Sequence, residues 1–359
     1  MPDIDAILSQ KDVWTALREC GEPVLIYGTG NGCEKLLNAF KAEGITADGI
    51  FTSDDFSQKS TFCGLDVMPL SKALERYDNF TAVLAFGTEL DDVMARIDGI
   101  ESTHHLYSPE LSVADNSYFT VSGLKERLED VKKVYSLLSD SRSREVFENL
   151  LCFKITGKLC YLRRSFCDRD DTFESILKLS ADEAYLDLGA YNGDTVIDFV
   201  KRTNASFRAL YAFEPDMRNF RKLVKNTCGI DNIELENSAA WSEDTVIRLS
   251  GASGRMSAVG NAGRLASARS VDSFLHGRDV TYIKYDVEGA DRQAILGSRE
   301  TIQKFSPKIC TAVYHRPYDM IDIPLLLERI CKGYSYYLRQ YKYYPAWETE
   351  LIMVKEQSV

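Results

Sequence analysis

Acidic side chains and a glycine-rich turn follow predicted strands in the second half of the chain. Asp187 stands near the end of the apolar run Ala184–Leu188, and Gly189 and Gly193 follow it, four residues apart. Glycines let the backbone turn sharply and approach a ligand before a helix begins. Glu214 ends the next predicted strand. In parallel α/β sheets, ligands bind at the edge where the carboxyl ends of the strands lie. Because Asp187, the glycines and Glu214 stand at such strand ends, the pattern predicts a ligand site at that edge.

The chemistry of this turn favours a cofactor without phosphate groups. A dinucleotide fingerprint has glycines two and then three residues apart, which admits a pyrophosphate. The spacing here is GxxxG, and Asp187 and Asp194 would repel phosphate. A carboxylate at the position of Glu214 accepts hydrogen bonds from a ribose diol. Ribose recognition, a glycine turn and no phosphate site together point to S-adenosylmethionine.

Two further strand ends supply candidates for catalysis. Asp286 ends the predicted strand Val280–Asp286, and His315 follows the predicted strand Ile309–Tyr314. If the methyl group of such a cofactor is transferred to an alcohol, the acceptor oxygen must be aligned, and a base that takes its proton helps the reaction. A histidine with a pKa near ~6.5 can accept a proton at neutral pH. We therefore expect Asp286 and His315 to be catalytic residues.

Other roles for these groups stay open. His315 could instead bind substrate, or orient its loop through a hydrogen bond to the backbone or to Asp319. Asp286, Glu288 and His315 could together hold a divalent cation. Because this mixture is not a distinctive ligand set, we expect no metal.

The strands that carry these residues predict a mostly parallel sheet with one antiparallel strand. The last two are separated by only eight residues, 342–349, which is too short for a crossover and predicts a hairpin. A stretch rich in Gly, Ser and Ala, Val246–Val271, predicts a small β excursion. The seven predicted strands are Ala184–Leu188, Ala209–Phe213, Ile233–Asn237, Val280–Asp286, Ile309–Tyr314, Ser335–Tyr341 and Glu350–Val354.

The first 107 residues repeat the same local plan. Val24–Tyr27 runs into a glycine-bearing turn, an amphipathic helix and a second strand, Gly49–Phe51, which is the pattern of a βαβ unit. Further apolar runs at Leu65–Val67 and Ala82–Phe86 extend it to a small parallel α/β domain. Its turn nearly fits GxGxxG, with Cys33 in place of the last glycine. This domain binds a nucleotide or nucleotide-sugar, or serves only as a docking scaffold.

Residues 108–180 predict a helical connector docked on its neighbours. Apolar residues recur in steps of four and three, which is a helical stripe. The stripe is formed by Leu124, Leu128, Val131, Tyr135 and Leu138, and a second helix carries Val146, Phe147, Leu150 and Leu151.

The second half of the chain resembles the FkbM-type class I methyltransferases over about residues 181–355. The resemblance rests on the run from Leu186 to Thr195, on Ala212–Pro215, on Ala239–Ser242 and on Ser270–Phe274. It rests above all on the run Ile283-Lys284-Tyr285-Asp286-Val287-Glu288-Gly289-Ala290-Asp291, whose DVEG core is more specific than the glycine turn. Asp291 stands where the family often has Glu.

The resemblance implies a Rossmann-like sheet and methyl transfer from S-adenosylmethionine, usually to a hydroxyl of a saccharide or small metabolite. It also implies the placement of the cofactor. Asp187 and Gly189 would line the methionine end, and Glu214 would hold the ribose. The segment Ala239-Ala240 would flank the adenine, and Asp286 would lie beside the transfer centre. The expected cofactor-binding residues are Asp187, Gly189, Ala190, Tyr191, Gly193, Asp194, Glu214, Pro215, Ala239, Ala240 and Asp286.

The composition bounds the remaining interpretations. The chain has 359 residues, 45% of them hydrophobic and 27% charged, which predicts about two folded domains. Residues 1–107 hold 8 basic and 18 acidic side chains. This charge disfavours nucleic acid and anionic membranes as partners, because both need clustered Lys and Arg. The 9 cysteines contain no CxxC pair, and no signal peptide or membrane-length apolar run is evident, so we expect a cytoplasmic protein with reduced thiols.

Two other classes of function stay open. One is an NAD-dependent sugar-nucleotide oxidoreductase centred on residues 1–107, which is disfavoured because these residues contain no Tyr-x-x-x-Lys pair. The other is a non-catalytic nucleotide-binding scaffold. The six tyrosines of residues 334–344 predict ordinary strand packing. They could instead form a stacking wall for a sugar, with Arg339 as a donor, or the edge of a homodimer.

Overall fold

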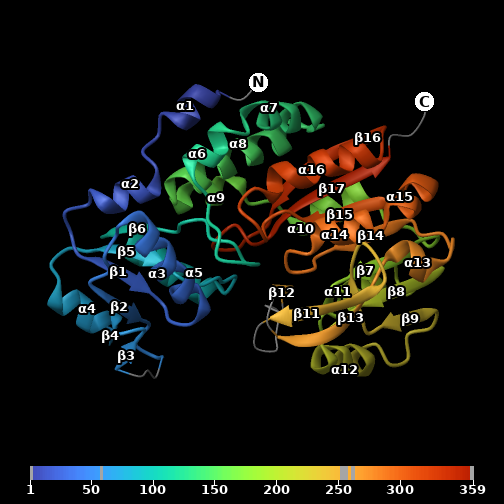
Figure 1. Cartoon of the computed structure of the whole chain (residues 1–359), viewed down its shortest axis with the longest axis horizontal. Coiled ribbons are helices and arrows are strands. Elements are labelled where there is room, and N and C mark those ends of the chain that lie inside the picture. The colour runs from blue at the N-terminus through green and yellow to red at the C-terminus, as the bar shows by residue number, and fades with distance from the viewer. Residues whose placement is uncertain (1–2, 57–59, 251–257, 260–262, 356–359) are drawn as a thin grey trace.

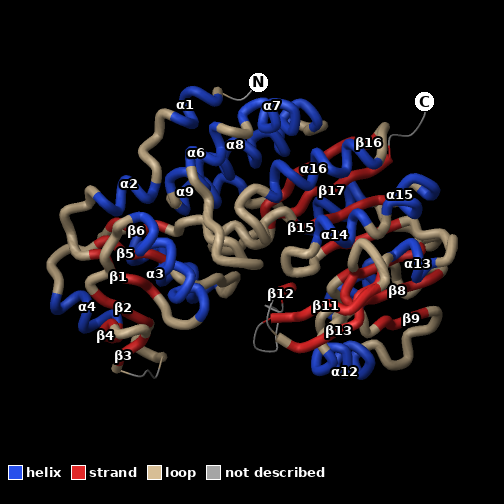
Figure 2. The backbone as a smooth tube through the Cα atoms, viewed as in Figure 1, coloured by secondary structure: helices blue, strands red, loops and turns tan. Residues whose placement is uncertain are grey.

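The computed structural model describes residues 3–56, 60–250, 258–259 and 263–355. Two sheets lie side by side and helices join them along one side (Figure 1). Figure 2 shows the helices that pack around each sheet. Within the described ranges, none of the helices combines the length and the apolar character that crossing a membrane requires.

The front sheet has six strands in the order β3-β4-β2-β1-β5-β6. Its neighbours pair in parallel except β3 and β4, and β1, α3 and β2 form the predicted βαβ unit. Its strands are β1 (Val24–Tyr27), β2 (Gly49–Thr52), β3 (Thr61–Phe62), β4 (Leu65–Pro69), β5 (Thr81–Leu84) and β6 (His105–Tyr107). Its helices are α1 (Ile4–Leu8), α2 (Val13–Arg18), α3 (Asn31–Glu43), α4 (Leu70–Arg76) and α5 (Asp91–Glu101).

The connector is helical, but its first predicted stripe is divided between two helices. The amide of Arg127 bonds to the carbonyl of Leu124, three residues back, and this tight turn separates α6 from α7. Leu138 lies beyond the second helix in extended backbone, although its side chain is buried. The elements are α6 (Val121–Lys125), α7 (Leu128–Leu137), α8 (Ser141–Thr156), α9 (Leu159–Ser165), α10 (Arg169–Thr172) and the π-helical turn η1 (Phe173–Leu177).

The second sheet has seven strands in the order β16-β17-β15-β14-β7-β8-β9. Only β17 runs antiparallel to its neighbours, and β16 and β17 form the predicted hairpin. The strands are β7 (Ala184–Leu188), β8 (Ala209–Phe213), β9 (Ile233–Glu236), β14 (Tyr282–Tyr285), β15 (Lys308–Ala312), β16 (Tyr334–Gln340) and β17 (Thr349–Lys355). The helices are α11 (Asp194–Arg202), α12 (Met217–Asn226), α13 (Val271–Leu275), α14 (Asp291–Leu296), α15 (Arg299–Phe305) and α16 (Asp319–Ile330).

The predicted β excursion is a separate small sheet in the order β10-β13-β11-β12. Its inner face buries Ile247, Leu249 and Ala268. Part of the predicted stretch, residues 251–257 and 260–262, lies outside the described residues. The strands are β10 (Ala239–Ala240), β11 (Thr245–Ser250), β12 (Ala258–Val259) and β13 (Arg264–Arg269).

The connector and the two large sheets pack into one core. One apolar core cluster includes buried side chains from the front sheet, the connector and the second sheet. After β5, the amide of Thr88 donates to the carbonyl of Tyr344 at 2.7 Å, and the amide of Tyr344 returns a bond of 2.9 Å. The loop between β16 and β17 is therefore tied by its backbone to the front sheet.

The outer edge of β16 is covered by the connector. The side chains of Ser139 and Ser143 accept bonds from the amides of Tyr336 and Leu338. Arg339 is buried and its Nη2 donates to Asp140 at 2.6 Å. These contacts support strand packing for the tyrosine-rich segment and leave Arg339 engaged by the connector instead of by a sugar.

Candidate functional site

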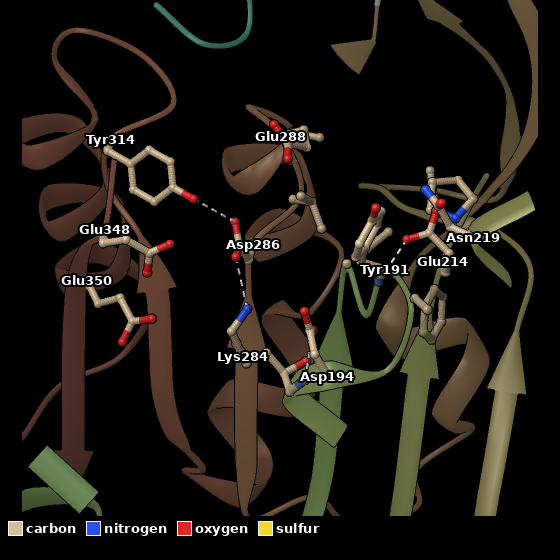
Figure 3. Close-up of a pocket in the computed structure, with 18 of the residues that line it drawn as sticks. Tyr191, Asp194, Glu214, Asn219, Lys284, Asp286, Glu288, Tyr314, Glu348 and Glu350 are labelled. Carbon is tan, nitrogen blue, oxygen red and sulfur yellow. Dashed lines mark hydrogen bonds and ion pairs between the residues drawn. The ribbon is translucent and has the colours of Figure 1, made fainter. Parts of the chain in front are cut away.

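A cavity of about 350 Å³ opens at the carboxyl ends of β7, β8 and β14, beside the small sheet (Figure 3). Elements from all parts of the chain contribute to its wall. It is lined by Glu89, Arg169, Gly189, Tyr191, Asp194, Thr195, Asp198, Phe213, Glu214, Pro215, Asn219, Ala239, Ala240, Leu249, Lys284, Asp286, Val287, Glu288, Ala290, Tyr314, Glu348 and Glu350.

The glycine turn approaches the neighbouring strand too closely for any larger residue. Gly189 has φ +96°, and a Cβ at this position would lie 2.0 Å from the carbonyl oxygen of Asp286. Gly193 has φ +89° and directly precedes α11. Both conformations favour glycine, which explains how the turn exposes its backbone to the cavity.

Glu214 is fixed at the cavity by backbone amides. Its Oε2 accepts from the amide of Tyr191 at 2.9 Å, and its Oε1 accepts from the amide of Asp216 at 2.7 Å. Burial raises the pKa of Glu214 to about 7, although these two backbone bonds oppose the change. The bonds hold the carboxylate on the wall of the cavity with its remaining lone pairs available to a ligand.

A chain of alternating charges runs beneath the cavity floor. Asp187 is fully buried, opposite Lys284 on the neighbouring strand, and it accepts a hydrogen bond from the hydroxyl of Thr195. Lys284 Nζ donates to Asp286 Oδ2 at 3.0 Å. Burial by itself lowers the pKa of Lys284, but the carboxylates of Asp286 and Asp187 outweigh it and hold this pKa above its usual value. Lys284 is therefore charged and offsets the buried Asp187 and the half-buried Asp286.

Asp286 stays ionised because two cations face it. Burial raises its pKa, but Lys284 and His315 dominate and hold the pKa well below its usual range. Tyr314 also donates its hydroxyl to Asp286 Oδ1 at 3.3 Å. A carboxylate with so low a pKa is an electrostatic group and a weak proton acceptor.

His315 lies behind the cavity wall and not on it. Its side chain is fully buried, with Nδ1 2.8 Å from Asp291 Oδ2 and Nε2 3.3 Å from Asp286 Oδ1. Burial alone would lower the pKa of His315, but Asp291, Asp286 and Glu288 raise it well above its ordinary value. An imidazolium cannot accept another proton, so this placement argues against the expected base role and favours the positioning alternative.

The partner of His315 differs from the one considered in the sequence. Asp291 takes the place of Asp319, which instead accepts the amide of Arg316 at 2.9 Å. Asp291 also accepts from the amides of Val287 and Gly289, at 3.3 and 3.2 Å. The shorter acid at position 291 therefore organises the turn that follows Asp286.

The structure brings most of the predicted cofactor-binding residues to one cavity. Those that line it are Gly189, Tyr191, Asp194, Glu214, Pro215, Ala239, Ala240 and Asp286. Asp187, Ala190 and Gly193 are buried behind it. These three shape or charge the wall, and their contact with a cofactor stays a prediction.

Several lining residues were not found by sequence reasoning, because tertiary packing brings them in. Glu89 follows β5 of the front sheet, and Arg169 begins α10 of the connector. Arg169 pairs with Glu348 at 2.8 Å and with Glu350 at 3.2 Å. Glu348 and Glu350 flank the start of β17. Two acids at the start of a predicted strand are a pattern in the sequence from which these two site residues could have been predicted.

Comparisons with known proteins agree with the resemblance seen in the sequence. Residues 187–338 match the family model of the methyltransferase FkbM domain. The crystal structure of methyltransferase FkbM from Methylobacillus flagellatus matches 98% of this chain and 92% of its own, with TM-score 0.72 and 19% identity. Residues 187–338 are therefore similar to the methyltransferase FkbM domain, and the chain shares the fold of the Methylobacillus flagellatus structure.

Other solved structures match about half of the chain. An rRNA methylase from Streptococcus thermophilus covers 50% of this chain and 90% of its own, with TM-score 0.33 and 14% identity. Fibrillarin from Aeropyrum pernix, solved with S-adenosyl-L-methionine, covers 49% of this chain and 68% of its own, with TM-score 0.31 and 14% identity. None of the curated proteins compared with the chain matches it.

Proposed function

We propose that this methyltransferase uses S-adenosylmethionine to methylate a hydroxyl oxygen of a saccharide, nucleotide-sugar or small metabolite. The observation that carries the proposal is the position of Glu214. Its carboxylate is held by two backbone amides on the wall of a cavity, one strand away from a glycine turn. That arrangement suits a ribose diol.

The charges around the cavity fit a cationic cofactor. Asp194, Glu214, Asp286 and Glu288 line it, and both basic side chains described on its wall, Lys284 and Arg169, are engaged by carboxylates. A sulfonium and an amino group are favoured next to such acids, whereas a pyrophosphate is not. The donor set therefore suits S-adenosylmethionine better than a dinucleotide.

The residues divide the work of binding. Glu214 would hold the ribose hydroxyls, and Ala239 and Ala240 would flank the adenine. Gly189 and Tyr191 would offer backbone beside the methionine end, with Asp194 nearby. When bound, S-adenosylmethionine supplies a methyl group activated by positive sulfur.

The chain itself contributes alignment and electrostatics at the transfer point. Asp286 accepts hydrogen bonds from Lys284 and Tyr314 and lies 3.3 Å from Nε2 of His315, so its position is fixed. A charge fixed in this way needs no reorganisation during the reaction. Holding the acceptor oxygen in line with the methyl group contributes several kcal/mol to catalysis.

Titration calorimetry with S-adenosylmethionine and with NAD tests the cofactor. We expect binding of the former only, with a loss of tenfold or more in Glu214→Ala and in Asp187→Ala. Binding that is unaffected by both substitutions would contradict the site assignment. Methylated products formed from a cell extract with labelled cofactor, identified by mass spectrometry, would then reveal the acceptor.

A further inference from the structure

We propose that Glu348 is the general base that takes the proton of the acceptor hydroxyl, at a subsite built jointly by the front sheet and the β16–β17 loop. The inference rests on the proposed methyl transfer and adds to it the catalytic base. It also narrows the proposed acceptors to those without phosphate groups, which excludes nucleotide-sugars.

Glu348 lies where an acceptor would meet the transfer centre. It immediately precedes β17, and Figure 3 shows its carboxylate directed into the cavity on the same side as Tyr314 and Asp286. Arg169 Nη2 holds its Oε2 at 2.8 Å, while 30% of the side chain remains exposed. The carboxylate is thus both oriented and accessible to a ligand.

The electrostatic surroundings separate Glu348 from Asp286. Partial burial of Glu348 is the main cause that raises its pKa, to about 7. Glu350 and Asp286 act in the same direction, and Arg169 and Lys284 oppose them. A carboxylate with a pKa near the working pH is a suitable general base. Asp286, which faces two cations, is not.

The front sheet fixes the loop that carries Glu348. Thr88 and Tyr344 exchange two backbone hydrogen bonds, of 2.7 and 2.9 Å. A Cβ on Gly87 would lie 2.5 Å from the ring of Trp347, so the two segments pack without spare room. Glu89 then lines the cavity from the front sheet. The same contact that docks the two sheets thus completes the acceptor side of the site.

The class of acceptor follows from these groups. Glu89, Glu288 and Glu348 all line the cavity, and its described cations are engaged by carboxylates. Such a wall accepts hydrogen bonds from hydroxyl or amino groups and repels phosphate. The acceptor is therefore a neutral or cationic polyol, such as an unphosphorylated saccharide unit.

The transfer step conserves atoms and charge. A lone pair of the acceptor oxygen forms the new C–O bond as the bond between methyl carbon and sulfur breaks, and that bonding pair goes to sulfur. The hydroxyl proton passes to the Glu348 carboxylate, so one sulfonium cation and one carboxylate become a neutral thioether and a neutral acid. The acid then returns its proton to solvent.

The main test compares Glu348→Gln with Glu300→Gln, a surface control on α15. Methyl transfer is followed from pH 5.5 to 8.5 with an extract fraction that the wild type methylates. For the wild type and the control, kcat should rise with pH through about 7. In Glu348→Gln, kcat should fall at least 100-fold and should no longer rise with pH through about 7. The affinity of this variant for S-adenosylhomocysteine should stay within twofold of the wild type. Less than a threefold loss in kcat would overturn the proposal.

Infrared difference spectra give a readout without an acceptor. In the S-adenosylhomocysteine complex, a protonated carboxyl band should disappear between pH 6 and 8, and in Glu348→Gln this band should be weaker by the contribution of one carboxyl. Asp319, whose pKa burial also raises to about 7, contributes equally in both proteins. If Glu348 is already ionised at pH 5, the proposal fails even if methyl transfer itself is established. If S-adenosylhomocysteine does not bind the wild type, the proposed function fails first.

A second pair of variants tests the role of the front sheet. Gly87→Ala should displace the loop and raise the acceptor KM several-fold, with S-adenosylhomocysteine affinity unchanged. Gly99→Ala, on α5, is the matched control because a Cβ there meets no atom within 4 Å. If the two variants have the same acceptor KM, the front sheet does not contribute to the acceptor site.

Discussion

The two large sheets carry equivalent turns with different surroundings. After β1, Gly28 has φ +107°, and the ring of Phe86 lies where its Cβ would be, at 2.6 Å. After β7, Gly189 faces the cavity and its backbone packs against Asp286. The fold supplies both turns, but the side chains around them decide whether a ligand can approach.

The acids that follow the second strand of each unit differ in the same way. In the front sheet, Asp54 is exposed and accepts the amide of Ser71 at the start of α4, at 3.0 Å. Asp55 is exposed and pairs with Arg96 at 3.7 Å. In the second sheet, Glu214 is buried at the cavity. Acidity at a strand end therefore indicates a site only where the acid is also buried and aimed.

The largest expected effect on methyl transfer comes from Gly189→Ala. The new Cβ would meet the carbonyl of Asp286 at 2.0 Å, at a φ that alanine rarely adopts. We expect a loss of about 3 kcal/mol or more in the free energy of unfolding and no measurable cofactor binding. Urea denaturation and calorimetry check this. Wild-type affinity would show that the turn is not the cofactor site.

Asp286→Asn should come next. The substitution removes the carboxylate that Lys284 and His315 share, which leaves Lys284 to Asp187 and His315 to Asp291. We expect a loss of up to about 3 kcal/mol of stability, and methyl transfer should fall by at least 100-fold. Initial rates and urea denaturation measure the two effects. Asp279→Asn is the control, because its pair with Arg208 is exposed and contributes under about 1 kcal/mol.

The pH dependence of cofactor binding should be intermediate in size. Ribose hydroxyls favour the ionised form of Glu214, whose pKa is about 7 in the free protein. Binding therefore releases a proton, and affinity should increase up to about tenfold per pH unit below pH 7 and level off above it. Calorimetry with S-adenosylhomocysteine at pH 6, 7 and 8 tests this. In Glu214→Gln the affinity should be lower and independent of pH over this range.

The smallest effect is expected in the front turn. Gly30 has the same φ, +96°, as Gly189, but a Cβ there meets no atom within 4 Å. Gly30→Ala should cost about 1 kcal/mol in stability through backbone strain, with unchanged cofactor affinity and kcat. Weaker binding of S-adenosylhomocysteine in this variant would mean that the front turn, too, contributes to the cofactor site.

The sequence predicted the elements whose patterns are local. All seven strands of the second sheet lie within two residues of their predicted ends. Most are apolar runs bounded by polar residues, whereas Ile233–Asn237 alternates apolar and polar residues and Ser335–Tyr341 is rich in tyrosine. The stripe from Leu124 to Leu138 was less secure, since its spacing is compatible with two helices as well as one. The turn at Arg127 interrupts it without a glycine or proline to signal the break.

Site residues could be predicted from the sequence where their position depends only on the strand that they follow. Asp286 and Glu214 could be placed from the order of strands alone. The pKa of His315 could not, because it depends on Asp291 and Glu288 across a turn. Glu89 and Arg169 reach the cavity only through docking of the front sheet and the connector. Such contacts leave no spacing pattern in the chain.

The paired bonds between Thr88 and Tyr344 also give the molecule an internal reporter of motion. Each amide is protected by the other residue's carbonyl, so both protons can exchange with solvent only when the segments separate. Their hydrogen-exchange rates would therefore measure how often the two sheets part, without turnover and without any ligand. Where reclosing is slower than intrinsic exchange, the exchange rate equals the rate at which the segments open. If product leaves by that route, this opening rate sets an upper limit on the turnover number.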